Sequence, residues 1–338
     1  MPDDAIWISE SDVTALIDMP SAIRALEAGL LAEAHGAASN MTKTHVEFDA
    51  GGGHGTLHAI GAAFPGAGIV GTKTWAHTPG GATPLLILYD ASTGRLNAIV
   101  EAFALGQLRT GAASGVATKW LAAEDADELA LIGTGKQSIA QVAAIAAVRS
   151  LKRVRVFGRD PERRRRAAAR IREELGVDAI EATSIADAVK DAPIVTAVTR
   201  AREPFLTSAM VARGAHVNAV GAITPGGAEI ATDLVARCTR VVVDSPPQAR
   251  RLSRELIDCY GTDEERWKTV RPLSAVVAAR QPRTAADDLT LFKSLGMGIS
   301  DLALGIEVYD RAIRQGVGRS FEHPKTAAPR LRPNDVQV

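Results

Sequence analysis

The hydrophobic and polar positions along the chain form two distinct patterns. Between residues 42 and 100, apolar and polar side chains alternate in short stretches, such as Ile69-Val70-Gly71-Thr72-Lys73-Thr74-Trp75, with Gly-rich turns between them. This period of two predicts strands of an antiparallel meander. Apolar positions with helical spacing flank the region, in the first forty residues and again from Phe103 to Leu121.

A different pattern begins near Asp127, where short apolar strands alternate with helical stretches. Such alternation predicts a parallel sheet covered by helices on both faces, so the expected fold class is α/β. The last segment, from Thr284, is predicted to be helical, with Leu289, Leu291 and Leu295 among its apolar positions.

Composition narrows the class of protein. The chain has 338 residues, 46% hydrophobic and 23% charged, which suits two globular domains. Its 39 Lys and Arg balance 39 Asp and Glu, which argues against a nucleic-acid partner. Two cysteines, Cys238 and Cys259, exclude a disulfide framework or a cysteine-rich zinc site, and no metal site is expected. Without a signal segment or a long apolar run, the sequence indicates a cytoplasmic protein with no membrane partner.

A glycine-rich turn, Gly133-x-Gly135-x-x-Ser138, follows an apolar strand and opens an Ala-rich helix. In such a turn, backbone N–H groups and a helix N-terminus bind a pyrophosphate; the first Gly permits the tight turn and the second lets the phosphate approach. The triplet alone is weak evidence. The strand before it, the helix after it and a second strand about 20 residues on together predict dinucleotide binding.

Gly158-Arg159 ends that second strand, where an NAD-specific site usually carries Asp or Glu. Residues 149–172 hold eleven Arg or Lys against Asp160 and Glu162. Because a guanidinium fork suits a 2′-phosphate, Arg159 favours NADP(H). The run 163–166 is better explained as a solvated helix face.

Two cations lie in unusual settings. Lys73 stands within an apolar strand, and Arg109 stands among small residues at a predicted helix start. A cation in such a setting needs a partner if it is buried. Spacing alone favours an internal ion pair or a side chain that snorkels to the surface.

Three motifs change this interpretation. The runs Thr93–Ala122, Leu131–Ser138 and Phe292–Asp301 resemble the signature of the ornithine cyclodeaminase/μ-crystallin family. The resemblance implies a homodimer of two-domain subunits. In each, a Rossmann dinucleotide-binding domain (122–300) is inserted into a mixed α+β substrate-binding and dimerisation domain (1–121 with 301–338).

The resemblance also implies roles for single residues. Lys73 corresponds to a catalytic lysine beside the substrate carboxylate and reacting carbon, and Arg109 to a catalytic arginine near the carboxylate and the nicotinamide. Lys43 stands where the family usually has a carboxylate-binding arginine. The expected cofactor-binding residues are Arg109, Gly133, Thr134, Gly135, Lys136, Gln137, Gly158, Arg159, Thr199, Asn218, Val220, Gly221, Leu295 and Gly296.

One departure from the family bears on the activity. Cyclodeaminases of the family carry a catalytic Asp two residues after Gly221, where this chain has Ile223. Isoleucine has no ionisable group to handle the substrate amine and a water. The Ala-Ile-Thr-Pro loop (222–225) is instead similar to that of iminosuccinate reductase-like members.

The resemblance therefore implies NAD(P)H-dependent reduction of a small 2-imino acid, iminosuccinate- or ketimine-like, to an L-amino acid, reversible as an amino-acid dehydrogenase. His45, His58 and His77 are candidates for binding a second substrate carboxylate, with His77 the first choice, although each is more often a core or surface histidine. Two alternatives stay open. One is a cyclodeaminase or cyclic hydroxyamino-acid dehydratase, and the other a non-catalytic protein that binds NADP(H) or another ligand.

Overall fold

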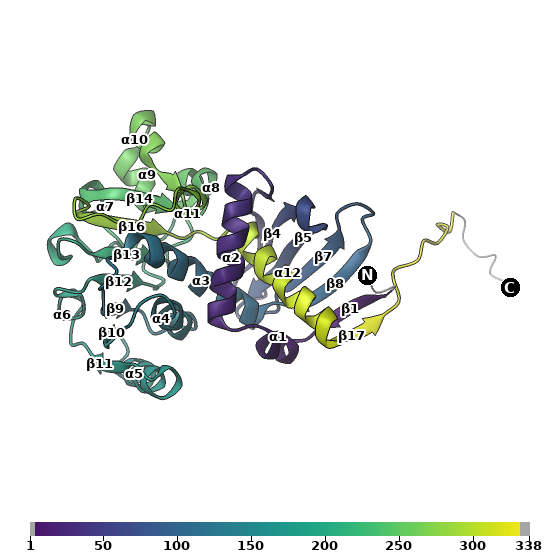
Figure 1. Cartoon of the computed structure of the whole chain (residues 1–338), viewed down its shortest axis with the longest axis horizontal. Helices are drawn as coiled ribbons and strands as arrows, with labels where there is room; N and C mark the ends of the chain where they lie inside the picture. Colours follow the sequence, from purple (N-terminus) through teal and green to yellow (C-terminus); the bar gives the residue numbers. More distant parts are fainter. Residues whose placement is uncertain (1–3, 332–338) are drawn as a thin grey trace.

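The computed structural model describes residues 4–331 and contains two β-sheets side by side (Figure 1). Helix α2 (Met19–Ala34) stands between them, and α12 (Gly298–Gln315) crosses one face of the first sheet (Figure 1). None of the described helices is long and apolar enough to cross a membrane.

The first sheet has nine strands in the order β17-β1-β8-β7-β5-β4-β2, with β3 paired to β4 and β6 to β5. β1 is parallel to β8, and the other described pairings are antiparallel, so most of the predicted meander is present. The strands are β1 (Ala5–Ile8), β2 (Ser39–Asn40), β3 (Thr44–Asp49), β4 (His54–Phe64), β5 (Ile69–Thr78), β6 (Gly81–Ala82), β7 (Leu85–Asp90), β8 (Leu96–Glu101) and β17 (Arg319–Phe321).

The second sheet is parallel, in the order β11-β10-β9-β12-β13-β16-β14-β15. Its chain order reverses between β9 and β12, which is the switch point of a Rossmann-type fold, and the predicted fold class is confirmed. The strands are β9 (Glu128–Ile132), β10 (Arg153–Phe157), β11 (Asp178–Glu181), β12 (Ile194–Ala197), β13 (His216–Ala219), β14 (Cys238–Val243), β15 (Arg271–Pro272) and β16 (Leu289–Lys293). All lie within the predicted range 122–300, although the domain boundaries themselves stay a prediction.

The remaining helices cover the sheets and connect their strands. In the second part of the chain, helices precede or follow the parallel strands, as crossover connections require. The helices are α1 (Glu10–Leu16), α3 (Phe103–Leu121), α4 (Ser138–Ala146), α5 (Pro161–Leu175), α6 (Ile185–Val189), α7 (Thr232–Arg237), α8 (Pro246–Leu252), α9 (Arg254–Tyr260), α10 (Glu264–Thr269) and α11 (Leu273–Ala279).

Helix α3 connects the two sheets. Small and apolar residues fill its buried face, where it packs against α2 and α4, and the chain enters β9 soon after α3 ends. Buried side chains of α2, α3, α12 and the first sheet form one continuous core, while two further cores fill the faces of the parallel sheet. Arg109, in the second turn of α3 rather than at its start, therefore lies near the junction of the two parts.

Helix α12 approaches the first sheet unusually closely. A side chain at Gly298, the first residue of α12, would overlap the backbone of Gly61 on β4, so only glycine fits there. Because the helix lies so close to the sheet, Asp301 in the first turn of α12 reaches Lys73 on β5.

The helical prediction from Thr284 is wrong over Leu289–Lys293, which forms the interior strand β16. All five residues of β16 are buried, because helices cover both faces of the sheet. A short apolar run of this kind has the same pattern as a buried helix, so periodicity could not separate the two. The first forty residues also include strand β1, although the prediction there was helical.

Candidate active site

The buried carboxylate of Asp301 joins the two cations that the sequence singled out. Lys73 donates a hydrogen bond to Asp301 Oδ1, and Arg109 Nε lies 3.3 Å from the same oxygen. The Lys73 side chain is 4% exposed and that of Asp301 0%, so the two form an internal ion pair. Among the described residues Asp301 Oδ2 has no hydrogen-bond partner, which leaves an acceptor free in the site.

Burial also controls the acidity of Lys73. Loss of solvent lowers the pKa of Lys73 to about 8, although Asp301 raises it, and the neighbouring charges of Arg109 and Lys43 add to the lowering. An ammonium group with a pKa of about 8 gains and loses a proton readily near neutral pH, which suits a general acid or base.

Lys43, between β2 and β3, is the third cation of the group and is buried. Burial and the charge of Arg109 lower the pKa of Lys43, whereas Asp244 and Asp301 raise it. The Lys43 carbonyl accepts a hydrogen bond from Arg251 Nη2 on α8 at 2.8 Å. This bond links the loop between β2 and β3 of the first sheet to helix α8, which follows a strand of the parallel sheet.

Asp244, which directly follows β14, holds the predicted Leu295–Gly296 turn in place. Its Oδ2 accepts hydrogen bonds from the backbone N of Leu295 at 2.7 Å and of Gly296 at 2.6 Å. A side chain at Gly296 would contact the Arg109 guanidinium, so this turn lies against the site. Burial raises the pKa of Asp244, while these backbone hydrogen bonds lower it. The sequence analysis missed Asp244, although an Asp at the carboxyl end of a buried strand was a usable signal.

The predicted pyrophosphate loop lies between β9 and α4, at the switch point of the parallel sheet. Gly133 has φ 119°, and a side chain there would collide with the backbone of Val198, so the first position of the turn requires glycine. No described atom lies within 4 Å of the place a Gly135 side chain would occupy, which leaves room for a phosphate. Gln137 Oε1 is buried and, within residues 4–331, has no partner. These features fit a dinucleotide.

Thr134 and Lys136 belong to the same loop. A side chain at Gly158, at the end of β10, would contact Thr134, so the structure brings these two predicted cofactor residues together. Lys136 Nζ instead lies 5.3 Å from the ring centroid of Phe103, at the start of α3.

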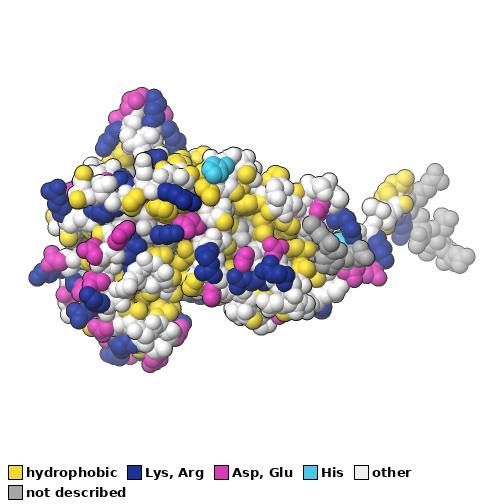
Figure 2. Space-filling model, viewed as in Figure 1, with side chains coloured by type: hydrophobic (Ala, Val, Ile, Leu, Met, Phe, Trp, Pro, Cys, Tyr) yellow, Lys and Arg dark blue, Asp and Glu magenta, His cyan; other side chains and the backbone are white. Residues whose placement is uncertain are grey.

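Arg159 is exposed just beyond β10, and most of its basic neighbours have other partners. Arg163 pairs with Asp160 and Arg164 with Glu181, as the solvated-face interpretation expects. Lys and Arg are interspersed with Asp and Glu on the visible face of this part of the molecule (Figure 2). The assignment of Arg159 to a 2′-phosphate stays a prediction.

The predicted residues at the ends of β12 and β13 are held by a carboxylate that the sequence analysis missed, that of Glu229. Its oxygens accept hydrogen bonds from the backbone N of Thr199 and of Gly221 at 2.5 and 2.7 Å. Asn218 is fully buried within β13, where its side chain contacts His216 and Thr118. The Asn218 side chain therefore has protein partners, and its role in cofactor binding stays a prediction. Val220, at the end of the strand, is also buried.

A row of aromatic rings extends from Lys73 along the same face of the first sheet. The Lys73 ammonium lies 5.1 Å from the Trp75 ring centroid, Trp75 stacks on His58 at 4.7 Å, and His58 stacks on His45 at 5.5 Å. Burial is the main cause that lowers the pKa of His58 to about 4, so its ring is neutral at pH 7. His77, the first choice for a substrate carboxylate, is exposed on β5 beyond Trp75.

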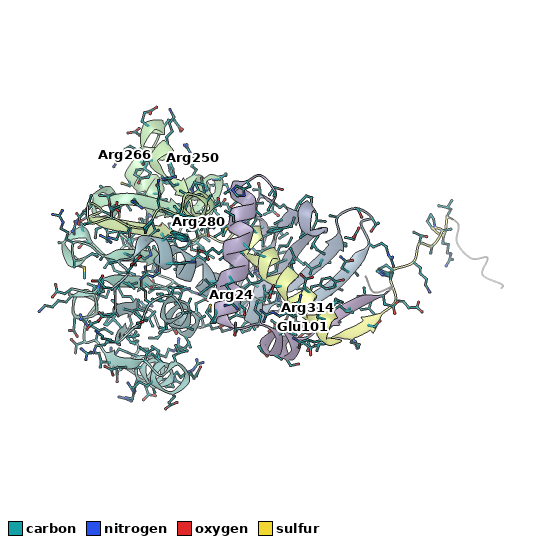
Figure 3. The ribbon with its side chains drawn as sticks, viewed as in Figure 1. Arg24, Glu101, Arg250, Arg266, Arg280 and Arg314 are labelled. Atoms are coloured by element: carbon teal, nitrogen blue, oxygen red, sulfur yellow. The ribbon has the colours of Figure 1, made fainter. Side chains whose placement is uncertain are left out.

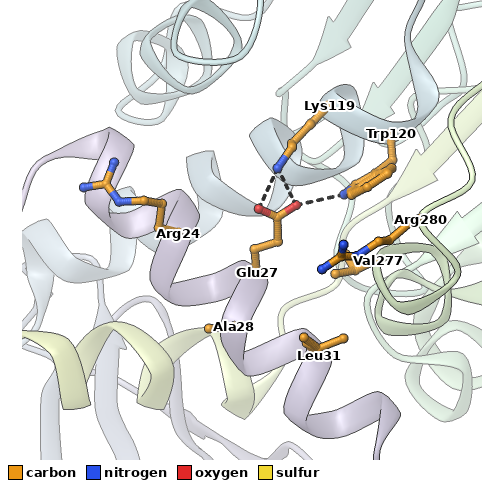
Figure 4. Close-up of a pocket in the computed structure, with 8 residues that line it drawn as sticks. All are labelled: Arg24, Glu27, Ala28, Leu31, Lys119, Trp120, Val277 and Arg280. Carbon is orange, nitrogen blue, oxygen red and sulfur yellow. Dashed lines mark hydrogen bonds and ion pairs between the residues drawn. The ribbon is translucent and has the colours of Figure 1, made fainter.

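A separate open cavity of about 420 Å³ lies between α2, the end of α3 and α11 (Figure 4). Glu27 in it accepts hydrogen bonds from Lys119 Nζ and Trp120 Nε1 (Figure 4). Arg24 and Arg280 line it from α2 and the end of α11 (Figures 3 and 4). None of the predicted site residues lines this cavity, so it is distinct from the site around Lys73.

Residues 4–316 match the ornithine cyclodeaminase/mu-crystallin family along nearly the whole fold just described. The chain belongs to this family. The family resemblance drawn from the three sequence motifs is thus confirmed.

Several named relatives of the chain are oxidoreductases, and a probable ornithine cyclodeaminase of Bordetella pertussis is also similar, with a TM-score of 0.83 at 28% identity over 93% of this chain and 99% of that one. It is 33% identical over 242 residues to a Delta(1)-pyrroline-2-carboxylate reductase of Bacillus cereus, covering 70% of this chain and 74% of the relative. The structure of Paracoccus denitrificans iminosuccinate reductase in complex with NAD+ superposes with a TM-score of 0.86 at 28% identity, covering 94% of this chain and 99% of that one. The structure of an archaeal alanine dehydrogenase dimer with bound NAD superposes with a TM-score of 0.86 at 26% identity, with the same coverage of both chains.

Replacing Arg159 tests the predicted cofactor preference. Arg159→Ala should weaken NADPH binding by about tenfold and leave NADH binding nearly unchanged, because only NADPH carries the 2′-phosphate. Dissociation constants from the fluorescence of the reduced nicotinamide would show this. Arg163→Ala, which removes a neighbouring exposed charge, is the matched control. An unchanged ratio of NADPH to NADH affinity in Arg159→Ala would refute the assignment.

Proposed function

We propose that this protein reduces a small 2-imino acid to an L-amino acid with NAD(P)H, in a reaction reversible as an amino-acid dehydrogenation. The observation that carries the proposal is the buried group of Lys43, Lys73 and Arg109 around Asp301, at the junction with a Rossmann-type sheet. The named reductases among its relatives support the same class of reaction, an oxidoreductase acting on C=N.

The substrate carboxylate would bind between Arg109 and Lys43. Both side chains are largely removed from solvent, so they attract an anion more strongly than surface cations do. Arg109 Nε lies 3.3 Å from Asp301 Oδ1 in an ion pair but makes no hydrogen bond among the described residues, so its N–H is available to donate to a carboxylate. Holding the carboxylate fixes the position of the adjacent C=N carbon.

Lys73 would provide the proton that the imine nitrogen gains on reduction. In its protonated form Lys73 donates to Asp301 and lies close enough to Arg109 and Lys43 for their charges to lower its pKa. This repulsion favours release of the proton to the substrate, and Asp301 keeps the ammonium charged until then.

The loop of Gly133, Thr134, Gly135, Lys136 and Gln137 would hold the pyrophosphate of NAD(P)H, and the ends of β12, β13 and β16 would flank its nicotinamide. When bound, the cofactor supplies the hydride. Arg159 at the end of β10 supports a preference for NADP(H), which the Arg159→Ala experiment tests.

The charges in the site favour a substrate with one carboxylate. Around the position proposed for the substrate are the buried cations Lys43 and Lys73, the partly buried Arg109, and the buried carboxylates Asp244 and Asp301. For these five groups, with both carboxylates ionised, the balance is 3 − 2 = +1, which one substrate carboxylate neutralises. The neutral rings of Trp75 and His58 beside Lys73 add no charge for a second. A ketimine-like substrate therefore fits better than iminosuccinate, whose second carboxylate would need the exposed His77 as its partner.

A homodimer would cover an apolar patch on the other face of the same strands. Val46 and Phe48 on β3 and Leu57 on β4 are 57%, 41% and 46% exposed, and they point away from the face that carries Lys73. Contiguous exposed apolar side chains mark interfaces, and the similar alanine dehydrogenase is a dimer. A second copy of this chain is the proposed occupant. Sedimentation that finds only monomers would exclude it.

A screen of cofactor oxidation tests the proposed reaction. Purified protein is mixed with NADPH or NADH and either a cyclic imino acid or a 2-oxo acid with ammonia or methylamine. The 2-oxo acids include pyruvate, glyoxylate and oxaloacetate. Oxidation of the cofactor should lower the absorbance of the reduced nicotinamide. Turnover should be faster with a one-carboxylate imine than with oxaloacetate and ammonia.

Turnover of an amino acid without a change in absorbance would instead support the lyase alternative, although Ile223 lacks the carboxylate that a cyclodeaminase needs. Tight NADPH binding without turnover of any imine would support the ligand-binding alternative.

The pH dependence of the reduction tests the Lys73–Asp301 pair. Because Lys73 must be protonated, kcat/KM for reduction should fall as the pH rises through about 8. Asp301→Asn removes the charge that raises the pKa of Lys73, so this fall should move to lower pH by about one unit. Asp310→Asn changes an exposed residue on the same helix and is the control; the pH at which its kcat/KM falls should equal that of wild type. An unmoved or upward-shifted profile in Asp301→Asn would contradict the role of the pair.

A further inference from the structure

Glu229 is fully buried, and its carboxylate connects two loops of the parallel sheet. Oε1 accepts hydrogen bonds from Thr199 N at 2.5 Å and Thr199 Oγ1 at 2.8 Å. Oε2 accepts from Gly221 N at 2.7 Å and Ala222 N at 3.2 Å. Thr199 follows β12, and Gly221 and Ala222 follow β13. One side chain therefore fixes the ends of two neighbouring strands relative to each other.

Burying the Glu229 carboxylate costs free energy of desolvation. A buried carboxylate loses its hydration and needs several donors in compensation. For Glu229 these donors are three backbone amides and one hydroxyl, and no ion pair to it is present among the described residues. The carboxylate thus accepts hydrogen bonds from backbone N–H groups of two loops, and these bonds restrict the orientation of both loops.

The backbone of Glu229 is held in turn by a second buried pair. Glu255 Oε1 accepts from Glu229 N at 3.1 Å and from Lys293 Nζ at 3.1 Å. Both side chains are 0% exposed. Lys293 ends β16, directly before the Ser294–Gly296 turn that Asp244 holds against Arg109. The ends of β12, β13 and β16 are therefore connected through buried carboxylates.

These three strand ends lie on one side of the switch point. The loop after β9 is placed for the pyrophosphate and the end of β10 for the adenosine ribose, so β12, β13 and β16 belong to the other mononucleotide half. That half takes the nicotinamide, and its β16 turn contacts the cation Arg109. The position of the β12 and β13 loops consequently sets the distance between the nicotinamide and the group of Lys43, Lys73 and Arg109.

We propose that Glu229 is a positioning residue for the nicotinamide half of the cofactor, through Thr199 and Gly221. This inference rests on the proposed function, because it requires that NAD(P)H binds the Rossmann-type sheet. Glu229 itself does not touch the reacting atoms. It determines where the loops that flank the nicotinamide lie.

The test compares two ligands that differ in the nicotinamide. Glu229→Gln keeps the shape of the side chain but turns an NH2 group toward one pair of backbone N–H donors, so one loop loses its acceptor. Dissociation constants for the reduced cofactor and for ADP-ribose, which lacks the nicotinamide, would be measured by calorimetry. The reduced cofactor should bind about tenfold more weakly and ADP-ribose within about twofold of wild type. Glu203→Gln, an exposed change in the segment after β12, is the matched control with both constants unmoved.

The outcomes separate this inference from the proposed function. Equal weakening of both ligands in Glu229→Gln would show a general loosening of the domain and overturn the positioning role, as would no change in either. If wild type binds neither ligand, the proposed function itself fails. If Glu229→Gln does not fold, Thr199→Val takes its place; it removes a hydroxyl that donates to Glu229 Oε1 and accepts from Ala201 N at 3.2 Å. It should weaken reduced-cofactor binding in the same direction and by less.

Discussion

The ion pair between Lys73 and Asp301 is the interaction on which the rest of the structure depends. Both groups are excluded from water, and breaking such a pair by removing one partner typically costs about 3–5 kcal/mol, because a charge is left buried alone. The two residues are 228 positions apart in the chain. The pair forms because the chain leaves the first sheet through α3, builds the parallel sheet, and returns in α12 against β4 and β5. The candidate site thus requires that the chain return to the first sheet after it has formed the second.

A second feature, carboxylates that follow or face the ends of parallel strands, organises the other half of the site. Asp244 holds the turn after β16, and Glu229 holds the ends of β12 and β13. Each accepts hydrogen bonds from backbone amides rather than pairing with a surface cation. A carboxylate bound to several amides fixes a loop without occupying the space in front of it. In the proposed function, this leaves the cations Lys43, Lys73 and Arg109 to face the substrate.

The sequence predicted the local parts of this arrangement and missed those that depend on tertiary contacts. The Gly133–Ser138 turn was recognised because a strand precedes it and a helix follows it. Lys73 stood out as a cation in an apolar strand, although its expected role came only from the family resemblance. β16 was predicted as helix, since a strand buried on both faces has no period of two. Asp301 was part of a quoted motif, but nothing local shows that it faces Lys73. Glu229 binds Gly221, 8 residues away in the chain, and Thr199, 30 residues away, and neither spacing belongs to a motif that pointed to it.

The central claim is that Lys73, held by Asp301, handles the proton of the substrate while a separate sheet binds the cofactor. Comparing Lys73→Met with wild type tests it most directly, by measuring both imine reduction and the dissociation constant for the reduced cofactor. Lys119→Met, an exposed change near the end of α3, is the control. We expect turnover to fall about a thousandfold in Lys73→Met, with cofactor affinity nearly unchanged. Equal loss of cofactor binding, or retained turnover, would contradict it.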